Sequence, residues 1–209
     1  ESAPDDARRA ACLGRVVQAR RAGVGPALAE AYGKLVALEL RRGRVEAAGG
    51  LLAEQAQLFE LAGQAGPALD ALAQLRALKE DAGDVDAAVA LELQRAALLR
   101  DATFDLVAAE EALLHAFELR RSADVARTGA ELSRRREDVQ AEADWLDRQL
   151  LVLEAPGRRA EVLVRLAQLF LGPLSAPKQA AAAAAEALRL DGSLEEAQAL
   201  LASAEGRPA

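Results

Sequence analysis

Two short phrases recur along this 209-residue chain at an interval of about forty positions. The phrase GRVEAA at Gly43–Ala48 returns as GDVDAA at Gly83–Ala88, and DVA at 124–126 falls a further forty positions on. Independently, GPAL at Gly25–Leu28 returns at Gly66–Leu69. A repeat of this size indicates a stack of similar units, each of which buries its apolar face against its neighbours.

The composition predicts that these units are helical. Hydrophobic residues make up 52% of the chain but aromatic residues only 3%. Alanine and leucine supply most of the apolar share, and both favour helices, whereas the β-branched and aromatic residues of strands are scarce. We therefore expect an all-α protein without a sheet, in which small alanine faces let the helices approach closely.

Proline and glycine mark where the helices begin and end. Pro26, Pro67 and Pro177 are expected in first helical turns, and glycines 23, 43, 63 and 83 are expected to cap the C-terminal ends. With apolar periodicity, these signals predict helices over 5–22, 26–42, 45–62, 67–82, 85–100, 105–121, 124–135, 138–154, 158–171, 177–190 and 193–204.

The short connections require consecutive helices to run antiparallel. We expect one domain over 1–209 that contains about five helix pairs and a C-terminal capping helix. The expected pairs span 5–42, 45–82, 85–121, 124–154 and 158–190, and the cap spans 193–204.

The segment 160–201 resembles one tetratricopeptide (TPR) repeat followed by its capping helix. Leu163, Leu166, Ala167 and Phe170 stand where that family has its large, leucine, small and aromatic first-helix residues, and Ala187–Asp191 matches its closing Ala-Leu-x-Leu-Asp phrase. The second helix has small residues at the matching positions, Ala180, Ala184 and Ala187. Two departures are Gly192 in place of a proline and one extra residue in Gly172–Lys178. In the other pairs the match is partial, as with Phe59 and Gly129.

The resemblance implies a right-handed α-solenoid whose first helices line a concave groove for a peptide or helix of another protein. Carried over by position, the groove would comprise Ala53, Gln57, Glu60, Leu93, Ala97, Arg100, Ala126, Ala130, Ser133, Val164, Gln168 and Leu171. These residues are mostly small and apolar, and they lack the lysine and asparagine pattern with which some members of the family clamp a terminal carboxylate. A partner helix or hydrophobic segment is the expected occupant. The open alternative is that these alanines only pack against neighbouring helices.

The sequence offers no catalytic, metal or cofactor site. His115 is the only histidine, so a helical metal site based on Glu111, His115 and Glu118 would lack matching ligands from other helices. The only cysteine, Cys12, lies on an apolar stripe and is expected to be a buried structural thiol. Trp145 is expected to pack within the fourth helix pair. We expect a protein that is not an enzyme and binds no cofactor.

Charge and hydropathy narrow the range of partners. The formal charge of −7 leaves no basic face for phosphates, and stacking aromatics are scarce, so nucleic acid is excluded as an expected partner. No apolar run reaches the length of a membrane span, so no membrane insertion is expected. The chain contains no methionine, and we expect it to be a piece whose native N-terminus is missing. A cytoplasmic location is favoured, and a periplasmic one stays open.

The expected function is a scaffold or adaptor that binds a peptide or helix of another protein in the concave groove. The alternative is a structural or regulatory segment of a larger polypeptide that packs against its own neighbouring domain. A small-molecule or lipid carrier is disfavoured, because the sequence shows no convergent polar groups for a pocket. Self-association stays open under each hypothesis.

Overall fold

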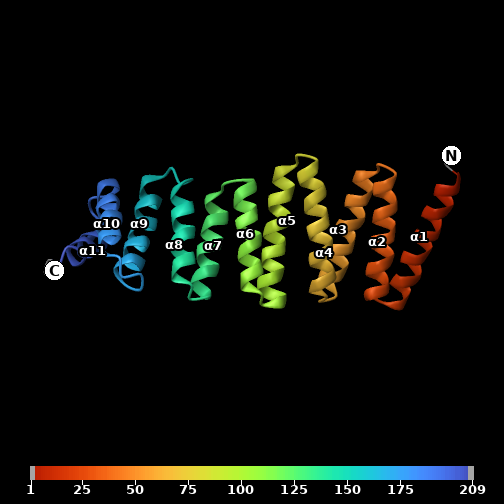
Figure 1. Ribbon diagram of the computed structural model, residues 1–209, viewed down its shortest axis with the longest axis horizontal. Helices are drawn as coiled ribbons and strands as arrows, with labels where there is room; N and C mark the ends of the chain where they lie inside the picture. Colours follow the sequence, from red (N-terminus) through yellow and green to blue (C-terminus); the bar gives the residue numbers. More distant parts are fainter. Residues whose placement is uncertain (1–2, 207–209) are drawn as a thin grey trace. The chain divides into compact units, whose positions relative to one another are not determined.

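The computed structural model describes the backbone of residues 3–206. In this range it has 11 α-helices, one π-helical turn and no strand. The helices are α1 Ala3–Ala22, α2 Pro26–Arg41, α3 Val45–Leu61, α4 Ala65–Asp81, α5 Val85–Leu98, α6 Leu106–Leu119, α7 Ala123–Arg135, α8 Val139–Leu150, α9 Pro156–Leu171, α10 Pro177–Leu190 and α11 Glu195–Ala204, and the π-turn is Leu99–Thr103. From α1 to α5, and again from α7 to α11, each helix runs back along the one before it (Figure 1). The predicted all-α, TPR-like fold of antiparallel helix pairs is confirmed; the right-handed superhelix stays a prediction.

The turn between consecutive helices of the first unit uses one residue in the left-handed conformation. Gly83 has φ of 73°, its N–H donates to the Glu80 carbonyl at 2.9 Å, and the Asp84 N–H donates to the Lys79 carbonyl at 2.9 Å. Gly43 and Gly63 make the same turn with φ of 69° and 68°. Glycine takes this conformation without the steric cost that a Cβ brings, which is why the predicted C-terminal caps are correct.

The turn between α7 and α8 has the same hydrogen bonds but a glutamate in place of glycine. Glu137 has φ of 59°, and the Asp138 N–H donates to the Ser133 carbonyl at 3.0 Å. The Asp138 carboxylate then accepts from the Ala141 N–H at 3.0 Å and caps α8. The capping bonds therefore hold Glu137 in a backbone region that is costly for a residue with a Cβ.

The sequence did not predict the π-turn after α5. The Asp105 N–H donates to the Leu99 carbonyl at 3.0 Å, as does the Thr103 hydroxyl at 2.8 Å. Phe104 follows with φ of 56°, and 79% of its surface is exposed. The predicted helix 85–100 therefore ends as α5 at Leu98 and continues only as this wider turn.

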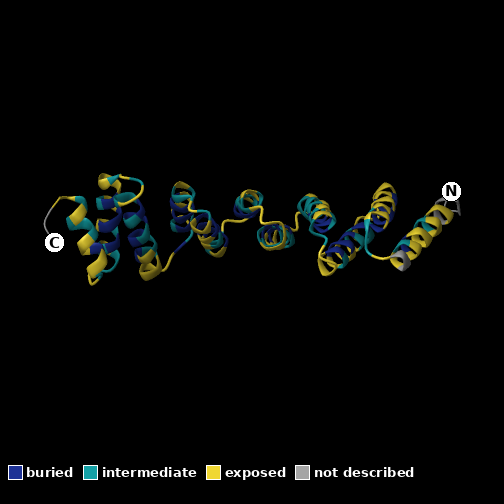
Figure 2. Cartoon of the chain, turned by 90° about the horizontal axis from the view of Figure 1, so that it is seen from below, coloured by how far each residue is buried: buried dark blue, intermediate teal, exposed yellow. Residues whose placement is uncertain are grey.

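The described chain divides into two compact units, 1–112 and 113–209, and the division falls within α6. In the first unit α1 to α5 pack in succession, each helix on the next. In the second unit α7 to α11 do the same, and α11 also contacts α9. Exposed residues line the outer sides of the helices (Figure 2). The prediction of a single domain stays a prediction.

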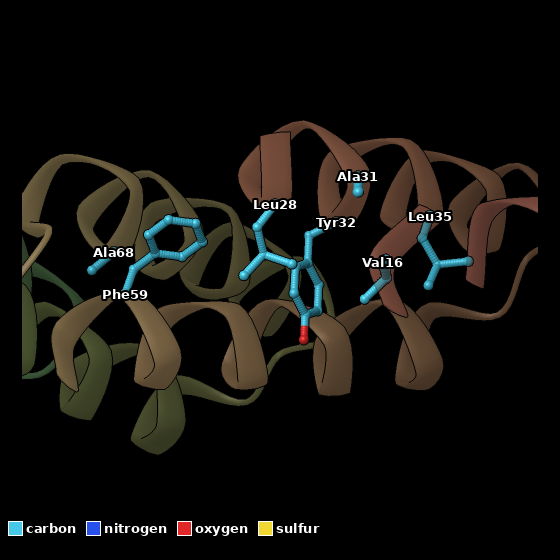
Figure 3. Packing of buried hydrophobic residues seen from close by; sticks show 7 residues of the cluster. All are labelled: Val16, Leu28, Ala31, Tyr32, Leu35, Phe59 and Ala68. Atoms are coloured by element: carbon cyan, nitrogen blue, oxygen red, sulfur yellow. The ribbon is translucent and has the colours of Figure 1, made fainter. Parts of the chain in front are cut away.

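The cores are thin layers shared by adjacent helices. In the first unit, Val16 of α1, Tyr32 of α2, Phe59 of α3 and Ala68 of α4 belong to one buried cluster (Figure 3). A second cluster continues it with small residues such as Ala48, together with leucines of α3 and α4. Burying one large side chain of this kind contributes about 1.5–3 kcal/mol.

The core of the second unit is built around Trp145, as predicted. Trp145 is 2% exposed and meets the Phe117 ring edge-on, with the ring centroids 6.1 Å apart. Gly129 of α7 lies directly against the indole, since a Cβ at this position would overlap the ring. The absence of a side chain at Gly129 therefore allows α7 and α8 to pack closely around the only tryptophan.

Replacing Glu137 with glycine is expected to stabilise the protein. Glu137→Gly removes the left-handed strain and should raise the free energy of unfolding by about 1 kcal/mol. The matched control Gly83→Ala introduces the same strain and should lower it by about 1 kcal/mol. Chemical denaturation measures both variants. A Glu137→Gly protein that is no more stable than wild type would contradict this account of the turn.

Candidate functional site

The outer side of α3 carries three of the residues predicted to bind a partner. Ala53, Gln57 and Glu60 are exposed, and Gly50 one turn earlier is exposed as well. The spacing of three and four residues places them on one stripe of the helix. Leu52, Ala56 and Phe59 form the opposite, buried side. This stripe is open to solvent, and its middle has no bulky side chain.

The same stripe recurs forty positions later on α5. Ala90 and Leu93 are exposed there, and Ala97 is half-buried. The predicted Arg100 lies in the π-turn, where its guanidinium forms two hydrogen bonds of 2.7 and 2.6 Å to Asp101. The exposed residues of α3 therefore recur on α5 at the same forty-residue interval as the buried ones.

Side-chain bonds connect the first helices of successive pairs along this side. Arg20 of α1 donates to Glu54 of α3 and to the Tyr32 hydroxyl. Gln94 of α5 donates to Glu60 of α3 at 2.9 Å. α1, α3 and α5 therefore present neighbouring stripes. On α1 the helical spacing places Leu13 and Val17 on the side of Arg20, and they are 40% and 50% exposed.

We call these stripes the first-helix face, defined by Leu13, Val17, Gly50, Ala53, Gln57, Glu60, Ala90, Leu93 and Ala97. Its helices carry exposed acids at the margins, including Glu46 and Asp86. Between positions 45 and 112 the sequence has 13 acidic residues and four basic ones. The face is thus a surface of small and apolar residues in an acidic setting.

The structure places the predicted residues of α7 inside the second unit. Ala126, Ala130 and Ser133 are 0%, 3% and 0% exposed, and the Ser133 hydroxyl donates to the Gly129 carbonyl at 3.0 Å. A partner cannot reach them in this fold. The exposed side of α7 instead carries Arg127 and Glu131. One residue of register turns a helical side chain by about 100°, which accounts for the difference.

The predicted residues of α9 lie at the edge of its buried side. Val164 is buried, while Gln168 and Leu171 are half-buried. The Gln168 amide donates to Glu196 of α11 at 2.5 Å, so it is used to connect two helices. The structure therefore groups Ala53, Gln57 and Glu60 with Leu93 and Ala97, and it does not extend this open stripe onto α7 in the same register.

Cys12 and His115, the only cysteine and the only histidine of the sequence, lie on α1 and α6. Cys12 is half-buried and packs against the first core cluster, so it is less enclosed than predicted. His115 is half-buried on α6. Over residues 7–20 and 23–206, whose side chains the structure describes, no group of three or more histidine, cysteine, aspartate or glutamate side chains could hold a metal ion. Over the same range, no helix combines the length and hydrophobicity needed to cross a bilayer.

Three buried glutamates are the main feature that sequence reasoning missed. Glu39, Glu92 and Glu142 have side chains only 1–3% exposed. Each lies between two arginines: Glu39 between Arg9 and Arg44, Glu92 between Arg76 and Arg95, and Glu142 between Arg134 and Arg165. Because a buried carboxylate needs paired cations, these triads fix which helices meet and in which register. An apolar stripe interrupted by one glutamate, with arginines nearby, is the signal that could have revealed them.

The triad of Glu142 joins three helices. Arg134 of α7 donates to Oε1 of Glu142 on α8 at 2.9 Å, and Arg165 of α9 donates to both carboxylate oxygens at 2.9 and 3.1 Å. Burial raises the pKa of Glu142, but the hydrogen bonds from Arg165 and Arg134 more than offset this, so the pKa lies below its ordinary value. The arginine run at 134–136 thus includes a structural partner for a buried acid.

No protein-family model matches the sequence, and no curated protein matches it. Among solved structures, a tetratricopeptide repeat protein from Parabacteroides merdae is similar with 17% identity and a TM-score of 0.47; the alignment covers 76% of this chain and 60% of that one. A thermophilic TPR protein from Thermus thermophilus is similar with 19% identity and a TM-score of 0.36, covering 85% and 98%. The TPR2AB domain of yeast Sti1, in a complex with pHSP90, is similar with 17% identity and a TM-score of 0.35, covering 98% and 84%. At these values, function must be argued from the surfaces of this chain.

Removing the buried charge of Glu142 should destabilise the protein in a pH-dependent way. Glu142→Gln leaves two arginines without their carboxylate and should lower the free energy of unfolding at pH 7 by about 1–3 kcal/mol. Because the folded-state pKa is lowered, this contribution is present above the ordinary pKa of 4.5 and is lost as pH falls through the folded value. Denaturation at pH 7 and at lower pH should therefore show that the difference in the free energy of unfolding between wild type and variant decreases as the pH falls.

The matched control is Glu131→Gln, at an exposed ion pair with Arg127 on α7. This variant should change the free energy of unfolding by less than about 0.5 kcal/mol, because solvent screens the pair. A difference in the free energy of unfolding between wild type and Glu142→Gln that stays constant below pH 4.5 would contradict the assigned role of Glu142.

Proposed function

We propose that this chain is a non-catalytic protein-interaction module that binds a helix or peptide of a partner protein on the first-helix face. The observation that carries the proposal is the exposure of Leu13 and Val17 on α1 and of Leu93 on α5, with small exposed residues on α3 and α5. Three connected stripes offer an extended surface, whereas scattered exposed apolar residues are normal on any protein.

The small residues suit a partner helix. Gly50, Ala53 and Ala90 let the backbone of a bound segment approach closely, and apolar side chains of the segment would meet Leu13, Val17 or Leu93. The proposed mode of binding is the docking of an amphipathic helix by its apolar side. The predicted residues of the second unit are not part of this proposal, because α7 buries Ala126, Ala130 and Ser133.

The negative charge around the first-helix face indicates which side chains a partner segment should carry. Glu60 accepts from Gln94 through Oε2, and Glu46 and Asp86 lie exposed near the starts of α3 and α5. Acidic groups of this kind favour a partner segment with basic side chains at its edges and raise the rate of its association at low salt. We therefore propose an amphipathic segment with an apolar stripe and basic flanks.

Site-specific photo-crosslinking in cells of the source organism tests the proposal. A benzophenone side chain at Ala53 and, separately, at Leu93 should capture the same partner protein. The matched control is Gln74, exposed on α4 and outside the first-helix face, and it should not capture that partner. Ala53→Arg and Ala90→Arg should each weaken the isolated complex at least about tenfold, because a bulky cation replaces a small contact.

The outcomes separate the two functional hypotheses. Capture of one separate protein from both face positions supports the adaptor. Crosslinks only to another part of the same polypeptide would support the structural or regulatory alternative. Equal capture from all three positions, or from none, would overturn the proposed face.

A further inference from the structure

A groove runs between α1 and α2 on a different side of the first unit. It consists of two adjoining hollows of about 520 and 360 Å³, both of which are lined by Arg15 and Lys34. Its floor is made of small or apolar residues, including Cys12, Ala31 and Leu38. The groove is open to solvent, so an elongated segment can enter along its length.

The rims of the groove are basic in an otherwise acidic protein. Arg8 and Arg15 line it from α1, and Lys34 and Arg41 line it from α2. Positions 1–44 hold nine basic and five acidic residues, whereas the whole chain has a formal charge of −7. The acidic residue in the lining is Glu30, to which Lys34 donates a hydrogen bond. Lys34 first, and Arg15 in addition, lower the pKa of Glu30, as expected in a positive potential.

The length of the groove suits a short helix. Its lining residues extend from Arg8 to Ala19 on α1 and from Ala27 to Arg41 on α2, which corresponds to about 16 and 21 Å at 1.5 Å per residue. A helix of about eleven to fourteen residues would fill it. The basic rims of the groove favour a helix with acidic groups. Its small, apolar floor favours a helix with small, apolar contact residues.

The chain carries such a helix in its second unit. α11 has 10 residues and is therefore about 15 Å long. Ala197 is buried on its inner side, while Glu195 and Ala199 are exposed on the outer side and Ala202 is half-buried. Glu195 and Glu205 bring negative charge to its two ends. The outer side of α11 thus fits within the length of the groove and matches it in charge and in the size of its contact residues.

We propose that α11 of a second copy of this chain docks in the groove between α1 and α2. The two surfaces are different, so the contact is heterologous and each copy can both donate a helix and accept one. Successive copies then associate head to tail. The groove contains no residue of the first-helix face. The self-association proposed here can therefore be tested independently of the proposed partner binding.

Complementary variants test this arrangement by sedimentation velocity. Wild type should show a weight-average mass that rises with concentration. A groove variant, Ala11→Glu with Ala37→Glu, overfills the exposed floor and repels α11, and a helix variant, Ala199→Arg, blocks the donated side. Each variant alone should remain a monomer. Their mixture should form a 1:1 complex and nothing larger, because each retains one intact surface.

Salt and crosslinking add readouts that do not depend on those variants. Raising the salt from about 0.05 to 0.5 M should weaken wild-type association at least about tenfold, because the rim charges become screened. Ala199→Cys should form a disulfide ladder through Cys12 of the next copy, whereas the control Ala182→Cys, exposed on α10, should not. Circular dichroism confirms that each variant is folded.

Three results would overturn the proposal. The first is a wild-type chain that stays monomeric at high concentration and low salt, which would leave the groove to an acidic helix of another protein. The second is association that persists in both blocked variants. The third is a mixture of the blocked variants that forms no 1:1 complex.

Discussion

Close approach of helices with small faces is the constraint on which the rest of this structure depends. Gly129 shows it most directly, because a single added Cβ would overlap the indole of Trp145 on the next helix. Ala48, Ala68 and Ala71 are fully buried between α-helices of the first unit. Interiors of this kind are close-packed but thin, so each helix is stabilised by the helices next to it and not by a common centre.

The thin layers of the core also explain why three glutamates are buried within it. Aromatic residues make up only 3% of the chain, and the triads of Glu39, Glu92 and Glu142 add directional contacts between helices to the packing of leucine and alanine. Such triads contribute little net stability over apolar residues, but they penalise any packing that leaves the carboxylate unpaired. The outer sides of the helices remain exposed to solvent, and the residues of the first-helix face and of the α1–α2 groove differ in charge.

The fold could be predicted because its signals are local. The forty-residue repeat and the glycines at 43, 63 and 83 depend only on neighbouring residues, and they place the turns correctly. The predicted residues of α3 and α5 share one register and lie exposed or half-buried, and their part in partner binding stays a proposal. Ala126 and Ala130 were misplaced because the repeat shortens there, and a shift of one residue moves a side chain from surface to interior. A glutamate within an apolar stripe marks each buried acid, but its partner arginines lie up to 30 positions away, so the pairing follows only from the folded structure.

Hydrogen exchange of the Gly129→Ala protein tests most directly the claim that helices are held by their neighbours. The added methyl should speed amide exchange in α7 and α8 by an amount equivalent to about 1–3 kcal/mol, because it forces the Trp145 ring out of place. Exchange in α2 to α4 should not change. Gly33→Ala, where an added Cβ meets nothing within 4 Å, provides the control and should speed exchange nowhere. Equal acceleration in every helix would show that the chain unfolds as one cooperative core and would contradict the account.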